Sequence, residues 1–431
     1  MNSLFEKIRL VFADKVLRRR IFITLALLTA FRFLAAIPVP GIDTAQIKGF
    51  FAGNQLLGLL NVFTGGSLSR LSIVMLGVGP YITSTIIMQL MTLISPRLKS
   101  MYQEEGEYGR KKFGQYSRLL MVPLALLQGW AFLTLLQRQG VINQLSSFEL
   151  VRNLGMISAG SFFLLWIGER ISEFGIGNGT SLIIFAGIVA ALPTSISQFI
   201  YTYLYPTFDP SILPTLIGVL VGIVAVVYAV VVITEAERPI PVTYAKRVRG
   251  NKVFGGVSTY LPLRLNQAGV IPIIFALSLL LFPSVIFQFL ASRFSSNHAL
   301  VSVSNWVVNT FNPNGWVYGI IYFILVFAFT YFYTAVTFDP NQISENLQKN
   351  GAFMPGVRPG QPTAIHISKI LTRLTAFGAL FLGIIAVLPL IVRALTGITA
   401  LTIGGTALLI VVSVIIELIK KTEAQITMKE Y

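Results

Sequence analysis

Ten apolar runs constrain the fold of this chain more than any other feature of its 431 residues. A helix needs about 20 apolar residues to cross the hydrocarbon core of a membrane. Only 12% of the residues are charged, whereas a soluble domain carries about 25%. The sequence therefore predicts an all-α polytopic membrane protein with ten transmembrane helices. The runs fall near residues 21–37, 73–94, 118–136, 154–172, 180–204, 212–234, 268–290, 316–336, 370–392 and 398–419.

Lysine and arginine are distributed unevenly among the segments that join these runs. Segments on the same side as the two termini hold 26 of them, and the opposite segments hold six. Cytoplasmic loops of membrane proteins carry an excess of Lys and Arg, so we expect both termini to be cytoplasmic. The basic start before the first run resembles a signal peptide, but no small-residue cleavage pattern follows. We therefore expect a retained first helix.

The stretch from 56 to 94 is irregular. Its first part, 56–69, is apolar at helical spacing, ends in Gly65 and Gly66, and is too short to cross a membrane. A span follows at 73–94, with an expected kink at Pro80 near its start. Two interpretations of 56–69 are equally open: a re-entrant helix beside a pathway, or a small interfacial helix in an external loop. Irregular backbone is tolerated at membrane depth only where protein or trapped water satisfies it.

Two inner loops, 235–265 and 339–368, are long, basic and rich in Gly, Pro and Asn. Such loops suit docking of a large acidic or RNA-rich partner. The alternative is that their basic residues only anchor the topology. The length of the loops favours docking, because orientation needs only a few charges.

An internal repeat is suggested by two short motifs. The second run of each half carries a similar pattern, VGPYI at 78–82 and VIPII at 270–274. Matching Pro or Gly interruptions in corresponding helices point to the functional pathway of an inverted-repeat protein. We therefore expect two five-helix halves of opposite topology, 1–205 and 206–431, with a second kink at Pro272.

Catalytic and ion-coupling chemistry has little support in the sequence. None of the 17 acidic residues falls in the middle of a run, there is no cysteine, and neither histidine has metal-ligand spacing. An ion-coupled transporter is expected to carry a buried acid, so an inverted-repeat small-solute transporter is the weaker alternative. We expect no enzyme activity, metal or cofactor. The glycines of 175–179 lack the context of a phosphate-binding loop and fit a tight turn between two helices.

Five stretches resemble the SecY family, the channel subunits of the bacterial protein translocase. They cover the chain in the expected order: PVPGID at 38–43, GGSLSRLSI at 65–73, GERISEFGIGNGTSLIIFAGI at 168–188, LPLRLNQAGVIPIIFA at 261–276 and GAFMPGVRPG at 351–360. The resemblance implies a clamshell of two halves around an hourglass pore. It also implies a bacterial inner-membrane location and a channel that translocates unfolded secretory chains and releases membrane helices into the bilayer.

The resemblance further implies four groups of functional residues. A pore ring of aliphatic side chains is implied at Val78, Ile82, Ile184, Ile188, Ile274 and Ile410. A plug that blocks the outer funnel is implied at about 56–69, including Leu57, Leu60, Asn61, Phe63, Thr64, Gly65, Gly66 and Ser67. A lateral gate between the second and seventh helices is implied at Thr83, Ile86, Ile87, Leu90, Gln128, Ile274 and Ser278. Docking of a motor or ribosome is implied at Arg247, Arg249 and Arg358.

The family also implies partners. These are the membrane subunits SecE and SecG, the SecA ATPase, the ribosome, signal peptides with the unfolded chains that follow them, and membrane lipids. An external motor or a translating ribosome would supply the energy, because the sequence has no nucleotide site of its own. A plug rich in glycine and serine is expected to pack weakly and to rearrange at low cost.

Overall fold

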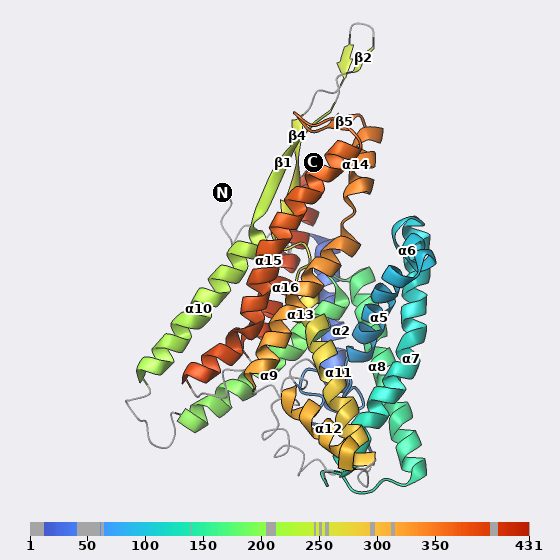
Figure 1. The fold of residues 1–431 in the computed structure, drawn as a ribbon, viewed down its shortest axis with the longest axis vertical. Helices are drawn as coiled ribbons and strands as arrows, with labels where there is room; N and C mark the ends of the chain where they lie inside the picture. Colours follow the sequence, from blue (N-terminus) through green and yellow to red (C-terminus); the bar gives the residue numbers. More distant parts are fainter. Residues whose placement is uncertain are drawn as a thin grey trace.

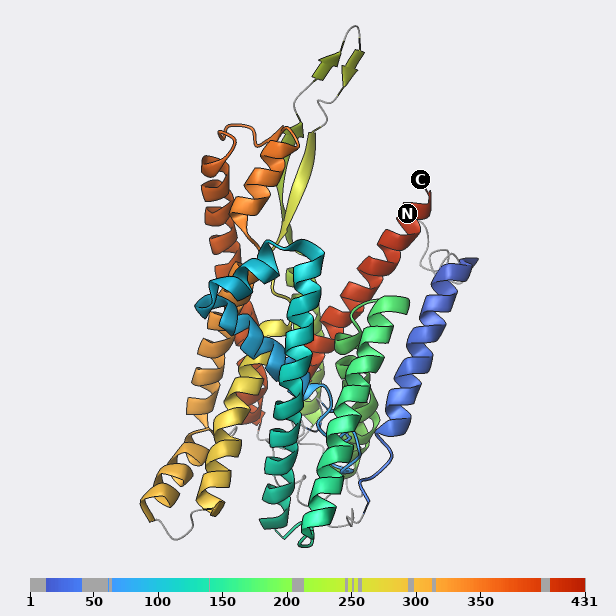
Figure 2. The ribbon, with the colours of Figure 1, turned by 90° about the vertical axis from the view of Figure 1, so that its right-hand side faces the viewer.

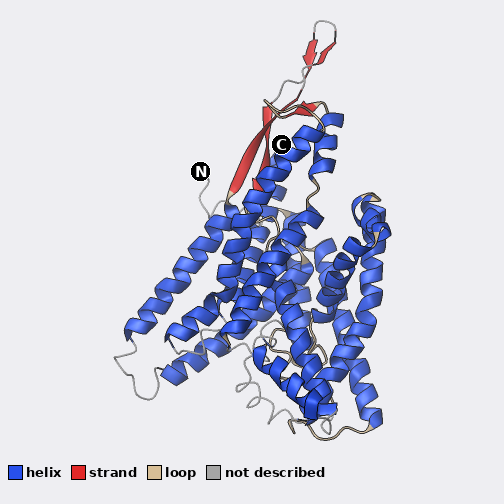
Figure 3. Cartoon of the chain, in the orientation of Figure 1, coloured by secondary structure: helices blue, strands red, loops and turns tan. Residues whose placement is uncertain are grey.

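The structure, a computed structural model, is a bundle of long helices with a small β-structure at one end (Figures 1 and 3). It describes residues 13–40, 61, 64–138, 140–203, 213–244, 247–249, 252–254, 258–293, 298–311, 315–396 and 404–430. The helices are α2 (Lys15–Leu34), α5 (Gly79–Ile94), α6 (Pro96–Gln103), α7 (Gly106–Arg138), α8 (Ser147–Phe174), α9 (Gly179–Tyr203), α10 (Leu213–Glu235), α11 (Ile271–Arg293), α12 (His298–Thr310), α13 (Trp316–Thr337), α14 (Pro340–Lys349), α15 (Gln361–Thr396) and α16 (Gly404–Glu430).

Each of the ten apolar runs overlaps one of these helices, which confirms the helical class. Within the described residues, four ranges are long and apolar enough to cross a membrane by length and composition. The count of ten spans stays a prediction. The four ranges are Gly106–Gln137, Ser147–Phe174, Trp316–Lys349 and Gln361–Val392.

The expected kinks at Pro80 and Pro272 are wrong, because both prolines lie in the first turn of a helix. α5 begins at Gly79 and α11 begins at Ile271, so the 73–78 part of the predicted span is a series of turns. Proline is well tolerated in a first helical turn, where its missing N–H would have no partner. The two motifs that suggested a repeat thus occupy the same position, at the start of α5 and of α11.

A small sheet joins the two long loops, which the sequence had not indicated as strands. The strands are β1 (Glu237–Tyr244), β2 (Arg247–Arg249), β3 (Lys252–Phe254), β4 (Ser258–Arg264) and β5 (Ala352–Phe353). β1 pairs antiparallel with β4 along its length and with β5 at its end, giving the order β4-β1-β5. β2 and β3 form a separate hairpin beyond the sheet.

Prolines explain why β1 was missed from the sequence. Pro239 and Pro241 argue against a strand, but β5 reaches only Thr243 and Tyr244, so one edge of β1 carries no partner at the prolines. The alternating Ile240 and Val242 are buried and were the available signal for a strand.

The two ends of the bundle differ. The start of α2, the end of α16, the sheet and α14 lie toward one end of the molecule, and α12 lies at the other (Figure 2). α12 falls in the predicted outer loop after α11, so that loop is partly helical.

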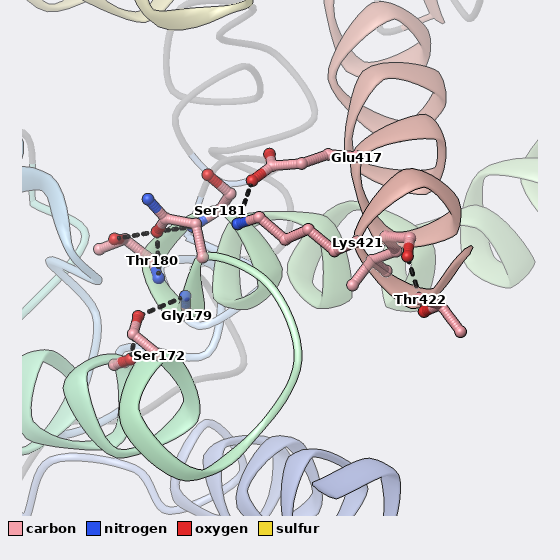
Figure 4. A network of polar contacts seen from close by, with 10 residues as sticks. Ser172, Gly179, Thr180, Ser181, Glu417, Lys421 and Thr422 are labelled. Carbon is pink, nitrogen blue, oxygen red and sulfur yellow. Dashed lines mark hydrogen bonds and ion pairs between the residues drawn. The ribbon is translucent and has the colours of Figure 1, made fainter. Parts of the chain in front are cut away.

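The turn at 175–179 joins α8 to α9, as predicted for a tight turn between two helices. The hydroxyl oxygen of Ser172 accepts a hydrogen bond from the Gly179 N–H at 2.8 Å, and the side-chain oxygen of Asn178 accepts from Thr180 at 3.1 Å. The turn faces α16, whose Lys421 and Glu417 form an ion pair (Figure 4). A Cβ added to Gly177 would lie 2.9 Å from Leu418 of α16. The turn thus packs closely against α16.

Candidate functional site

The six residues expected to form a ring lie in one apolar cluster. Val78, Ile184, Ile188 and Ile410 are buried members, and Ile82 and Ile274 pack against them. Four helices contribute, because these residues come from α5, α9, α11 and α16. Ile184 and Ile188 are four residues apart on α9 and so share one face of it. Spacing alone would not have selected these six among the many aliphatic residues of the chain.

The cluster sits close to helix beginnings. Val78 is the residue before α5, Ile82 is in its first turns, and Ile274 is in the first turn of α11. An α-helix rises 1.5 Å per residue, so the 16 residues of α5 extend about 24 Å, less than the hydrocarbon thickness of about 30 Å. The turns at 73–78 precede α5, and Val78 and Ile82 stand where these turns give way to helix.

The described part of the expected plug segment is partly buried beside this cluster. Asn61, Thr64, Gly65, Gly66 and Ser67 are described, whereas Leu57, Leu60 and Phe63 lie outside the described residues. A Cβ added to Gly65 would lie 2.8 Å from Gly187 Cα, next to Ile188, and 3.1 Å from Phe31. This end of the segment therefore lies inside the bundle, between α2 and α9.

The packing of this end is tighter than its glycine and serine content suggested. Ser67 is fully buried, and its hydroxyl lies within hydrogen-bonding distance of the carbonyl oxygens of Thr64, at 2.6 Å, and Val74, at 3.2 Å. Thr64 is also buried and faces Gly77. The small side chains here allow close approach of backbone to backbone, which holds this end in place.

The expected gate residues lie between α5 and its neighbours. Ile86 and Leu90 belong to a second apolar cluster with Ile273 and Leu277 of α11, and α13 and α15 also contribute to it. Both helices of the expected gate therefore meet along an apolar seam. Ile87 and Ser278 are half-buried, and neither belongs to this cluster.

Gln128 has a polar partner on the neighbouring helix, although the contact is long. Its side-chain amide donates to the Thr83 hydroxyl at 3.5 Å, and that hydroxyl donates to the Gly79 carbonyl at 3.0 Å. Gln128 is on α7 and Thr83 on α5, so this contact ties two helices of the first half together. It does not reach across to α11.

The three expected docking arginines lie at the end of the molecule that carries the sheet. Arg247 and Arg249 are in β2, and Arg358 is exposed in the turn that follows β5. The carbonyl of Arg358 accepts a hydrogen bond from Thr363 at 2.8 Å. The pairing of β1 with β5 makes one platform of the two loops, which the sequence presented as separate.

An ion-pair network attaches this platform to α16. Lys420 Nζ lies 3.1 Å from a Glu235 carboxylate oxygen and 3.8 Å from one of Glu237. Arg264 Nε lies 3.3 Å from the same Glu237 oxygen. Single exposed ion pairs contribute about 0–1 kcal/mol, but shared charges in a network contribute more. The network fixes the base of the β1–β4 ribbon.

No group of three or more His, Cys, Asp or Glu residues that could hold a metal ion occurs among the described residues. The residues expected to form the ring and the gate are instead mainly aliphatic and hydroxyl side chains. An aliphatic surface is one that can exclude water and ions.

Comparison with known proteins gives consistent matches. The family model described as SecY matches residues 72–419. The protein translocase subunit SecY of Thermus thermophilus is 41% identical over 423 residues, covering 96% of this chain and 94% of that protein.

Two solved structures share the fold at lower identity. One is a SecY protein whose plug domain stabilises the closed state of the translocation channel and maintains a membrane seal (20% identity, 94% of this chain and 92% of that one, TM-score 0.63). The other is Sec61 in a canine ribosome–channel complex from the endoplasmic reticulum (18% identity, 94% and 92%, TM-score 0.59).

Proposed function

The chain belongs to the SecY family, and we propose that it is the protein-conducting channel through which unfolded secretory chains cross the membrane. One observation carries this function. Six aliphatic residues from four helices meet in one cluster, and the end of the plug segment lies against it. A ring of apolar side chains excludes ions by dewetting and still accommodates any side chain of an extended polypeptide.

The same arrangement supports an assignment of the parts of this channel. The ring is the constriction, the 56–69 segment is the plug, and the apolar seam between α5 and α11 is the lateral gate. An incoming signal helix is apolar, so it exchanges the seam for lipid without a covalent step. The residues 1–205 and 206–431 form two five-helix halves with ten spans in all. We expect both termini on the cytoplasmic side of a bacterial inner membrane.

The platform of β1, β4 and β5 is the docking surface for a partner that supplies energy. Sec61, which shares this fold, occurs in a complex with a ribosome. Arg358 is exposed, and the 235–265 loop is basic in sequence, which suits RNA or an acidic protein as a partner. The SecA motor is the second expected user of the platform. SecE and SecG are the expected membrane subunits, and no enzyme activity of the chain itself is expected.

A stalled secretory chain provides the test. Cysteine replaces Ile82 or Ile274, and because the chain has no native cysteine, no other site competes for the cross-link. A translocating chain that carries a single cysteine is then arrested in the channel. We expect cross-links at both ring positions and none at Val189, which is exposed on α9. Repeated failure at both ring positions would contradict the function.

One experiment distinguishes the protein-conducting channel from the alternative, a small-solute transporter. A transporter moves its solute through the sealed state without any polypeptide present. Flux of a small solute through purified channel in liposomes, at a rate unaffected by an arrested chain, would favour the transporter. We expect instead that flux appears only when the plug is displaced.

A further inference from the structure

Arg32 makes an unusual contact for a residue near the end of an apolar helix. Its Nη1 donates a hydrogen bond to the Gly65 carbonyl oxygen at 2.6 Å, although 33 residues separate them in the chain. The contact is partly buried. A charged side chain at membrane depth is costly unless it is paired. Among the described residues, the recorded hydrogen bond of the Arg32 side chain is to this carbonyl, and no carboxylate pairs with it.

The segment around Gly65 is shaped to present that carbonyl. Gly65 and Gly66 have φ values of +72° and +78°, which only glycine adopts readily. Asn61 closes the turn: its carbonyl accepts from the Gly66 N–H at 2.7 Å, and its side chain accepts from the Ser69 N–H at 2.7 Å. The turn is thus internally bonded, and the Gly65 carbonyl is left for Arg32.

We propose that Arg32 is a positioning residue that latches the plug segment in the closed channel through the Gly65 carbonyl. The latch rests on the proposed function of 56–69 as a plug. A hydrogen bond from a charged donor is about twice as strong as a neutral one, so one bond is enough to bias the closed state. Being a single bond, it also breaks in one step when a translocating chain displaces the segment.

The arrangement distinguishes a latch from a general brace of the fold. α2 is held independently, since Phe31 packs in the ring cluster with α8 and α9 and Thr24 accepts from the Ile176 N–H at 3.2 Å. Loss of the Arg32 contact therefore removes one tie on the plug end and leaves α2 in place. A brace, by contrast, would be needed whether or not the plug is present.

The test is a double-mutant cycle on ion conductance of the purified full-length channel with its copurifying membrane partners. Arg32→Met is made in the intact channel and in a channel lacking 57–67. We expect the open fraction to rise about tenfold in the intact channel, equivalent to about 1.4 kcal/mol. In the channel without 57–67 we expect no further rise. An unchanged conductance in the intact channel, or the same fold rise in both channels, would overturn the latch.

Two further variants keep the test independent of whether Arg32→Met folds. Gly65→Ala disturbs the same bond from the other side, since its Cβ would approach Gly187 and Phe31, whereas Gly66→Ala has a similar φ and nothing within 4 Å. We expect leak from Gly65→Ala to exceed leak from Gly66→Ala, because only the former adds a collision to the shared strain. Equal leak from the two variants would also overturn the latch.

Arg70 is the matched control for charge. It is exposed beside the plug segment, and its positive charge repels that of Arg32. Arg70→Met removes the same charge as Arg32→Met, and we expect it to leave the leak unchanged or lower. Translocation of a secretory chain is measured in the same preparations. If the unaltered channel does not translocate, the proposed function is contradicted. If translocation is normal but the leak does not depend on Arg32, only the latch is contradicted.

Discussion

Ile184 lies almost wholly buried, with 4% of its surface exposed, in the apolar cluster that also holds the other expected ring residues. The seal we propose depends on such side chains offering no hydrogen bonds to water. Val189, which follows the buried Ile188 on the same helix, is 38% exposed. The helix α9 therefore has a face toward the cluster and a face away from it.

Replacement of Ile184 by Asn is expected to open the seal to ions. An unpaired amide in an apolar site costs about 1–3 kcal/mol by protein mutational data, and it recruits water that wets the constriction. We expect conductance of the purified channel to rise severalfold. Val189→Asn places the same amide on the other face and is expected to leave conductance unchanged. Equal conductance of the two variants would argue that Ile184 is ordinary core.

Arg358 is expected to act through a partner and not through the fold. Its side chain is exposed, so Arg358→Glu should leave the channel inserted and folded. Charge reversal at a docking surface costs complementarity with the partner, and we expect motor-driven translocation to fall about tenfold or more. Lys369→Glu, an exposed cation on α15, is the control and is expected to have little effect. Parallel loss of channel and of translocation would make Arg358 structural.

At the scale of elements, helix packing depends on glycines that admit a neighbouring backbone. Gly160 of α8 is such a position, because an added Cβ would lie 2.0 Å from the Ile73 carbonyl oxygen. Gly155, on the same helix, has nothing within 4 Å of an added Cβ. The irregular 73–78 segment thus lies directly against α8.

These two glycines give a matched pair for stability. Gly160→Ala is expected to lower the free energy of unfolding by about 1–3 kcal/mol, as overpacking does, and to lower the midpoint of thermal unfolding in detergent. Gly155→Ala is expected to be neutral, or to stabilise the helix by up to about 1 kcal/mol. A midpoint for Gly160→Ala equal to that of the unaltered chain would show that the 73–78 segment yields easily.

Helix positions were predictable from the sequence because apolar runs report burial along a single element. The ends were less so: the run 73–94 did not show that its first six residues are turns, since the same residue types suit both. β1 was hidden by Pro239 and Pro241, which its one-sided pairing accommodates. The contact of Arg32 with Gly65 depends on two segments 33 residues apart, and no local pattern predicts such a contact. The ring residues came from the family resemblance.

At the scale of the whole molecule, the proposed plug is the feature that we expect to separate a closed channel from an open one. Deletion of 57–67 removes most of the proposed plug, including Gly65, which lies between α2 and α9. We expect ion leak to rise by an order of magnitude or more, while secretory chains still cross, because the apolar ring remains. Conductance of the purified channel measures the leak. A conductance equal to that of the intact channel would remove the plug assignment.

The expected ring residues come from four helices, and Val78, Ile82 and Ile274 stand at or just before the starts of α5 and α11. We therefore expect the proposed constriction to widen by small tilts of these helices. None of the helices would have to unwind. Because no single helix surrounds the constriction, we expect an apolar substrate helix to exit sideways between α5 and α11. An extended chain would pass straight through.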